Sequence, residues 1–191
     1  KTHRAVVPRN LAESFLDMKF PDVSDVVINL GSNVQPISPN KNGLALIFEP
    51  ISHKQATINA KKKAIAAGGM SLVIPAAVSN IPGYSNMTIY NNNGLSSSLS
   101  KAATDAHWNS NKKRDGKVVT VRVYTLDEIL DWIPNKIPIK YLKTDIQGYD
   151  FLVVSKTNSE KFNRIESLMT EAYMVESSYK GVRNNVCDDW V

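Results

Sequence analysis

The sequence predicts an α/β fold with a mostly parallel sheet, helices on both faces and an added antiparallel hairpin. Short, continuously apolar runs at residues 26–28 and 44–48 are typical of strands buried on both sides. Helical patterns with capping residues alternate with these runs, which favours parallel strands joined by crossover helices. The 191 residues suit one core and contain no visible linker. We therefore expect a single domain over 1–191, excised from a longer chain or its ordered part.

The first half of the chain alternates predicted helices and strands. Asn10 can cap a helix, and Ser52 with Gln55 forms a capping box for the next one. Pro75 interrupts the third apolar run, which suggests an edge position, a bulge or a strand that begins after it. The elements predicted here are a helix over 10–19, strands over 26–28 and 44–48, a helix from 52 that ends at Gly68, and a strand within 72–78.

The second half begins with a predicted hairpin. Residues 87–90 and 118–123 alternate in polarity as an antiparallel hairpin on the sheet's edge would. The polar stretch 91–117 between them is longer than an ordinary connection, so we interpret it as a functional loop or lid. Thr125 and Glu128 form another capping box. The elements predicted after this box are a helix through 132, a strand over 139–142, a short helix over 151–154 and a strand over 167–174.

The composition excludes several classes of protein. Cys187 is the only cysteine, so an internal disulfide and a thiolate zinc cluster are excluded and a reducing compartment fits. No apolar stretch is long enough for a membrane span and no secretory signal is visible, so we expect a cytoplasmic protein. The net charge is +5, with basic runs only at 61–63 and 112–114. We interpret these runs as solvated surface rather than as a nucleic-acid face.

Polar residues follow three of the predicted strands, at 29–33, 49–50 and 145–150. In open α/β sheets, ligands bind at the carboxyl ends of the strands near the topological switch point. Gly31 would let the backbone approach a ligand closely, and Glu49 would offer a carboxylate to a ribose diol. The G-x-G-x-x-G pattern that cradles a pyrophosphate is missing. A nucleoside ligand without phosphates fits better, and S-adenosylmethionine is the common one.

Four segments resemble successive motifs of the FkbM family of methyltransferases. They are Val27-Ile28-Asn29-Leu30-Gly31-Ser32-Asn33, Phe48-Glu49-Pro50, Ala76-Ala77-Val78-Ser79 and Leu142-Lys143-Thr144-Asp145-Ile146-Gln147-Gly148-Tyr149-Asp150. The resemblance spans roughly residues 26–174. It implies a class I, Rossmann-like methyltransferase fold with S-adenosylmethionine as the methyl donor.

The resemblance also implies roles for individual residues. Gly31 and Asn33 would lie against the methionine portion of the donor, Glu49 would bind the ribose hydroxyls, and the turn at 77–79 would border the adenine. The implied donor-binding residues are Asn29, Gly31, Ser32, Asn33, Glu49, Pro50, Ala77 and Ser79. The chain departs from the family pattern at Asn29, where Asp is usual, and at Gln147 and Asp150, where many relatives have Glu. Pro36 and Pro39 also leave little room for the helix that normally follows the glycine turn.

Asp145 is the first candidate for the catalytic base, because a hydroxyl acceptor must lose a proton when it is methylated. A helix-capping or donor-orienting aspartate is the alternative reading. The candidate substrate contacts are Gln147, His107, Trp108 and Ser98, although His107 and Trp108 could equally anchor the polar loop. No metal site is assigned, but Asp145, Asp150 and Glu171 are the carboxylates that a divalent cation could use.

The function predicted is O-methylation of a sugar, a glycan or a similar small polyhydroxylated acceptor, in a domain that could be fused to others in a larger enzyme. A nucleic-acid methyltransferase is one alternative. The basic charge favours it, but base-methylating enzymes usually show Asn/Asp-Pro-Pro-aromatic where this chain has residues 145–148. A non-catalytic domain is the other alternative, because Asn29 removes a charge near the sulfonium. Salt-dependent affinity for nucleic acid would favour the first, and absence of any donor binding the second.

Overall fold

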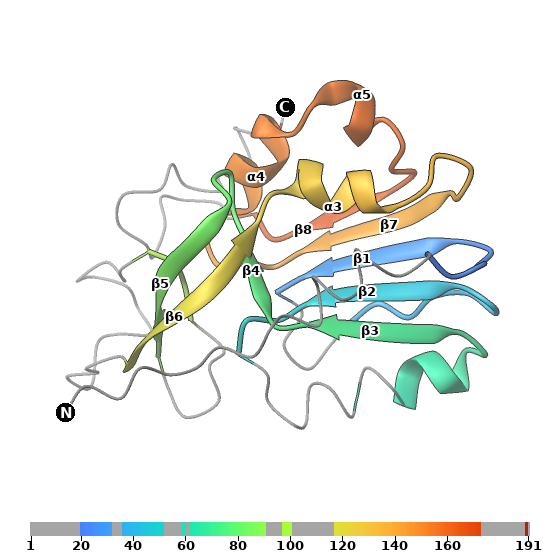
Figure 1. The fold of residues 1–191 in the computed structure, drawn as a ribbon, viewed down its shortest axis with the longest axis horizontal. Coiled ribbons are helices and arrows are strands. Elements are labelled where there is room, and N and C mark those ends of the chain that lie inside the picture. The colour runs from blue at the N-terminus through green and yellow to red at the C-terminus, as the bar shows by residue number, and fades with distance from the viewer. Residues whose placement is uncertain are drawn as a thin grey trace.

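The computed structural model describes residues 20–31, 36–51, 59, 62–90, 97–100, 117–172 and 190. Its centre is a five-stranded sheet in the order β3-β2-β1-β7-β8, in which every pair of neighbouring strands is parallel (Figure 1). The strands are β1 Val26–Leu30, β2 Leu44–Phe48, β3 Met70–Ile74, β7 Ile139–Thr144 and β8 Leu168–Thr170. The predicted parallel sheet is confirmed.

The apolar side chains of the central strands explain why both faces of this sheet are covered. All residues of β1 and β2 are buried. On one face, Ile28 and Leu46 belong to a core cluster that includes Ile129 of helix α3 (Leu126–Trp132) and Val153 of helix α4 (Asp150–Lys156). The side chain of Ile47, which belongs to a separate small core cluster, is buried as well. Both faces of the sheet therefore contribute to the core, as the continuous apolar runs predict.

The order of the strands creates a topological switch point between β1 and β7. The chain passes from β1 outward through β2 to β3, and later returns to β7 on the other side of β1. The connections from β1 and β7 therefore leave the same edge of the sheet in opposite directions, and the crevice between them is the usual ligand site of such sheets.

A second, three-stranded sheet lies beside the carboxyl ends of the main strands (Figure 1). Its order is β4-β6-β5, with β4 at Ala76–Val78, β5 at Gly83–Ile89 and β6 at Lys117–Tyr124. The predicted antiparallel pairing of β5 with β6 is confirmed, but this hairpin belongs to a separate sheet and not to the edge of the main one. Of the possibilities left open for the run 72–78, a strand that begins after Pro75 is confirmed by β4, and β3 lies at the edge of the main sheet. Pro75 has no N–H for a ladder, so β3 ends before it and β4 pairs with β6 after it.

The helices follow local capping signals. Thr125 and Glu128 make both hydrogen bonds of the predicted capping box at the start of α3. A short helix that sequence reasoning missed, α5 (Ser159–Phe162), begins after Asn158, whose side chain accepts from the amides of Glu160 and Lys161. Residues 62–66 are helical and end before Gly68, whose φ is 72°. The predicted helix over 10–19 and the capping box at Ser52 and Gln55 lie outside the described residues.

Helix α4 and strand β8 are two of the elements whose bounds differ from the predicted ones. Helix α4 covers residues 150–156 and is longer than the predicted 151–154, whereas β8 covers only 168–170 of the predicted 167–174. Glu171 therefore follows the strand instead of lying in its middle. Within the described part of the chain, no helix is long and apolar enough to cross a membrane.

Candidate functional site

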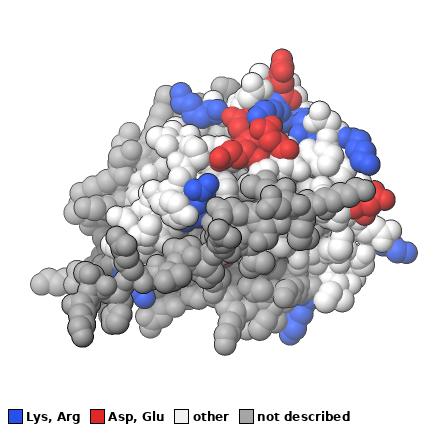
Figure 2. Space-filling model, in the orientation of Figure 1, with Lys and Arg blue, Asp and Glu red and all other residues white. Residues whose placement is uncertain are grey.

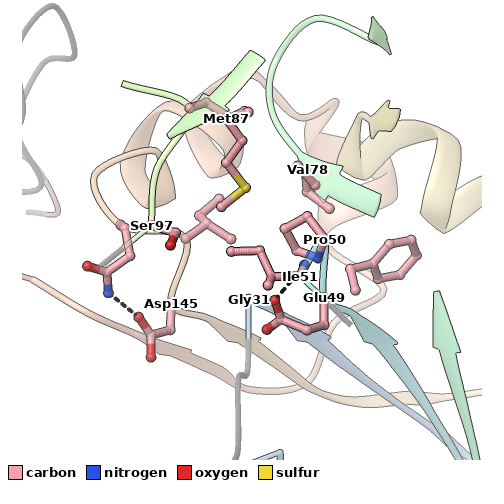
Figure 3. Close-up of a pocket in the computed structure, with 13 residues that line it drawn as sticks. Gly31, Glu49, Pro50, Ile51, Val78, Met87, Ser97 and Asp145 are labelled. Carbon is pink, nitrogen blue, oxygen red and sulfur yellow. Dashed lines mark hydrogen bonds between the residues drawn. The ribbon is translucent and has the colours of Figure 1, made fainter. Parts of the chain in front are cut away.

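A pocket opens at the switch point, between the carboxyl ends of the main strands and the second sheet (Figure 3). It encloses about 610 Å³, including the open space at its mouth. One wall comes from the ends of the main strands, namely Gly31, Phe48, Glu49, Pro50, Ile51, Asp145, Ile146 and Gln147. The opposite wall, here called the roof, comes from Ala77, Val78, Met87, Ser97 and Leu99. The lining is mostly apolar with a few polar groups, as is typical of small-molecule sites.

Gly31 lies where the backbone after β1 and the backbone after β7 come close together. Its φ is 64°, and a Cβ at this position would collide with the backbone carbonyl of Asp145. The amide of Gly31 donates to Phe48 O at 2.8 Å, and the amide of Asp145 donates to Leu30 O at 3.0 Å. Gly31 therefore permits a close approach of the Asp145 backbone, which brings both residues to one wall of the pocket; the close approach of a ligand to Gly31 stays a prediction.

Glu49 places a carboxylate at the pocket wall. The residue is 7% exposed, and its Oε1 accepts a hydrogen bond of 3.0 Å from the amide of Ile51, two residues further on. Its own amide donates to Ile74 O on the neighbouring strand β3 at 3.0 Å. The carboxylate is thereby fixed at the end of β2, beside Pro50, where the sequence places the ribose-binding acid.

Asp145 is held by the side chain of Gln147. The amide Nε2 of Gln147 donates to Asp145 Oδ1 at 2.7 Å and lies 3.4 Å from Oε2 of Glu171 (Figure 3). Gln147 has a left-handed backbone with φ of 55°, and the Ser98 hydroxyl donates to its carbonyl at 2.9 Å. Gln147, predicted as a substrate contact, therefore also orients the carboxylate of Asp145.

Asp150 supports the pocket from beneath. It is completely buried at the start of α4, and its Oδ1 accepts a 3.1 Å hydrogen bond from the amide of Ile146, a lining residue. Burial raises the pKa of Asp150 to about 6, the charge of Asp145 adds to the increase, and the Ile146 hydrogen bond opposes it. Asp150 thus fixes the loop after β7 and does not line the pocket.

The three carboxylates considered for a divalent cation do not converge. Asp150 is bonded to the backbone beneath the loop, and the amide of Gln147 bonds both Asp145 and Glu171. Among the described residues, no group of three His, Cys, Asp or Glu side chains could hold a metal ion.

Asn29 has a different position from the one predicted. It is completely buried in β1, where its Oδ1 accepts from the amide of Ile37 at 2.6 Å and its Nδ2 donates to Ile37 O at 3.2 Å. This side chain ties the segment after the glycine turn to the sheet. An ionised aspartate could not donate the second bond, so an amide suits this site better than an aspartate would.

The other predicted site residues divide into three groups. Ala77 and Pro50 line the pocket. Ser79 is buried beside the pocket, where its hydroxyl donates to Asn80 Oδ1. The hydroxyl of Ser98 donates to the carbonyl of Gln147, as described above. Ser32, Asn33, His107 and Trp108 lie outside the described residues.

Sequence reasoning missed part of the pocket, namely Ile51, Met87 and Leu99, and it offered Ser97 only as one member of the run Ser96-Ser97-Ser98 that could donate hydrogen bonds to the methyl donor or the acceptor. Ser97 adjoins the predicted Ser98 in a run of serines, and only the structure shows which hydroxyl faces the pocket. The apolar members carried no signal of their own, because an apolar residue in a ligand roof has the same sequence pattern as one in the core.

Basic side chains do not gather into one patch on the face shown in Figure 2, where Lys and Arg of the described residues are dispersed among acidic and neutral ones. Some are paired, as Lys140 is with Glu166 and Lys161 with Asp131, both at 2.7 Å. A nucleic-acid face needs a continuous positive surface, which this view does not show.

A family model described as the methyltransferase FkbM domain matches residues 25–188. The chain belongs to the FkbM methyltransferase family. The resemblance identified from the four sequence motifs is thereby confirmed, as is the Rossmann-like methyltransferase fold. Searches of curated proteins and of solved structures returned no match. The pocket at the switch point of this FkbM domain is consequently the candidate site of methyl transfer.

Proposed function

We propose that this FkbM domain uses S-adenosylmethionine to methylate a hydroxyl oxygen of a sugar, a glycan or a similar small polyhydroxylated acceptor. The observation that supports the proposal is the pocket itself, which carries Glu49 and Asp145 at two points of a mostly apolar lining at the switch point. A cationic sulfonium is favoured near such carboxylates, since their field is strong where water is excluded.

The residues present fit an adenosine-containing donor. Glu49 has a fixed orientation and would accept hydrogen bonds from the ribose hydroxyls. Ala77 and Val78 offer an apolar surface for the adenine. The bound donor supplies a methyl group that is already activated by its sulfonium. What remains for the protein is to position the acceptor and remove its proton.

Asp145 would receive the proton that the acceptor hydroxyl loses as its oxygen bonds to the methyl carbon, while the bond from this carbon to sulfur would break and leave S-adenosylhomocysteine. Gln147 already donates to Asp145 Oδ1, so the carboxylate cannot rotate freely and its other oxygen can be directed at the acceptor. A base in this position contributes about 10²- to 10⁴-fold to the rate. Met87 and Leu99 of the roof would keep water from competing with the acceptor.

The proposal is tested by calorimetric titration with S-adenosylmethionine and S-adenosylhomocysteine, using the wild type and Glu49→Ala. We expect micromolar binding by the wild type and a loss of at least ten-fold in the variant, because two ribose hydroxyls lose a charged partner. Glu166→Ala is the matched control, since this exposed carboxylate is paired with Lys140 away from the pocket. A wild type that binds neither ligand at millimolar concentration overturns the proposal and favours a non-catalytic domain.

Donor binding would justify a screen of sugar acceptors, with and without divalent cations, by transfer of a labelled methyl group. We further propose that the domain works in the reducing cytoplasm, which its single Cys187 supports. Salt-sensitive binding to RNA or DNA, with methylation of a base, would contradict the choice of a hydroxyl acceptor.

A further inference from the structure

Ser97 carries a buried hydroxyl with no hydrogen-bond partner among the described residues. The residue is 5% exposed, lines the roof of the pocket, and lies on the side of Asp145 and opposite Glu49 in Figure 3. A buried polar group that stays unpaired costs about 1–3 kcal/mol, so such groups are rare unless a ligand supplies the partner.

Bonds made by the neighbouring residue Ser98 fix the backbone of the segment that carries Ser97. Ser98 and Thr88 exchange two backbone hydrogen bonds, of 2.9 and 3.2 Å, which attach this segment to β5. The Ser98 hydroxyl donates to Gln147 O and accepts from the amide of Ser100 at 3.0 Å. The segment that carries Ser97 is therefore held between a sheet and the loop after β7, which keeps this residue in the lining of the pocket.

We propose that Ser97 donates a hydrogen bond to the carboxylate of the amino-acid portion of S-adenosylmethionine, an inference that rests on the proposed donor site. A donor whose ribose is bound by Glu49 would extend its amino-acid portion along this wall past Gly31, toward the end of the pocket where Asp145 and Ser97 lie. Asp145 as an anion repels the carboxylate of the methyl donor, whereas a serine hydroxyl can donate a hydrogen bond to that carboxylate. The other roof residues are apolar, so Ser97 is the roof's polar contribution.

The test compares two ligands that differ only in the part that Ser97 would bind. S-adenosylhomocysteine carries the amino-acid portion, and 5′-methylthioadenosine keeps the adenosine and the sulfur without it. By calorimetry, we expect Ser97→Ala to weaken S-adenosylhomocysteine binding about 10- to 150-fold, the effect of one hydrogen bond to a charged group. Its affinity for 5′-methylthioadenosine should equal that of the wild type.

Controls separate a lost contact from a damaged fold. Ser155→Ala, at an exposed position of α4, should bind both ligands as the wild type does. The melting temperature of ligand-free Ser97→Ala should be equal to or above that of the wild type, because the removed hydroxyl has no partner among the described residues. Ser97→Cys, with a weaker donor of similar size, should show an intermediate loss.

The outcomes are distinct. Equal S-adenosylhomocysteine affinity in Ser97→Ala and the wild type overturns this inference and leaves the donor site intact. So does an equal loss for both ligands, which would indicate a change in the shape of the pocket. A wild type that binds neither ligand overturns the proposed function itself.

Discussion

At the scale of single residues, the site depends on side chains that act on other side chains. Gln147 directs Asp145, Ser98 holds Gln147, and Asp150 holds the amide of Ile146. The first bond lies within the loop after β7, the second joins this loop to the segment that carries Ser98, and the third joins it to the start of α4. The candidate base therefore sits on a loop whose position is fixed from several directions, which is what transfer to a weak nucleophile requires.

Asp145→Asn separates binding from chemistry. The amide is nearly isosteric but cannot accept the acceptor's proton, so we expect the rate of methyl transfer to fall about 10²- to 10⁴-fold. S-adenosylhomocysteine affinity should change only a few-fold. The measurement is single-turnover transfer to an identified acceptor, with Asp131→Asn, an exposed carboxylate on α3, as the control. A variant with full activity would show that another group removes the proton.

Asp150 makes stability depend on pH. Its pKa rises from 3.8 to about 6 on folding, so between these values the folded protein binds a proton that the unfolded chain has lost. Stability should therefore fall as the pH rises from about 4 to about 6, by up to about 3 kcal/mol once the carboxyl is ionised in both states. Asp150→Asn keeps an oxygen for the Ile146 amide and removes the charge.

Urea denaturation at several pH values tests this expectation. Asp150→Asn should be more stable than the wild type at pH 7, and the two curves should converge near pH 4. Asp131→Asn, whose carboxylate is exposed, should follow the wild type closely. Destabilisation of Asp150→Asn at pH 7 would mean that the ionised carboxylate has a favourable partner.

At the scale of elements, the sequence predicted features that depend on neighbouring residues. It did not predict which strands pair when they lie far apart along the chain. The capping box at Thr125 and Glu128 was readable because its donors and acceptors lie within one helical turn. The division of residues 70–78 into β3 and β4 was not, because a strand's partner is chosen by residues far along the chain. Helix α5 was missed because a four-residue element has no periodicity to detect.

Thr125→Ala measures how much the capping box contributes to the free energy of unfolding. The substitution leaves the amide of Glu128 without its acceptor and frees the Glu128 side chain from one of its two bonds. We expect a loss of about 1 kcal/mol in the free energy of unfolding. Thr125→Ser should retain most of it, and equal stability of all three proteins would contradict the structural role.

At the scale of the whole molecule, an aromatic cluster joins the two sheets to a helix. Phe48 at the end of β2 stacks on Trp132 of α3 with ring centroids 5.9 Å apart, and Tyr124 of β6 meets the same indole edge-on at 4.9 Å. The sequence predicted the parallel ladder, whose strands are apolar on both sides. The sequence could not predict this aromatic cluster or the composition of the roof, because each of them combines residues from three separate segments.

Trp132→Ala should weaken both sheets together. We expect a loss of about 2–4 kcal/mol, somewhat below that of a fully buried aromatic residue because Trp132 is partly exposed. Far-UV circular dichroism and hydrogen exchange in β6 should report one shared transition. Tyr84→Ala, at a residue 57% exposed on β5, is the control for loss of an aromatic group. Two separated transitions in the wild type would show that the sheets fold independently.

The two walls of the pocket differ in how they are encoded. The strand-end wall is assembled from three distant places, at 31, 48–51 and 145–147, whereas every roof residue falls within 77–99. A single exchange of that short stretch between relatives would replace the entire roof and leave the parallel ladder and Glu49 untouched. Recombination can therefore alter which molecule fits under the roof while the opposite wall is inherited unchanged. Insertions between the strands of this stretch would enlarge the roof without changing the register of the main sheet.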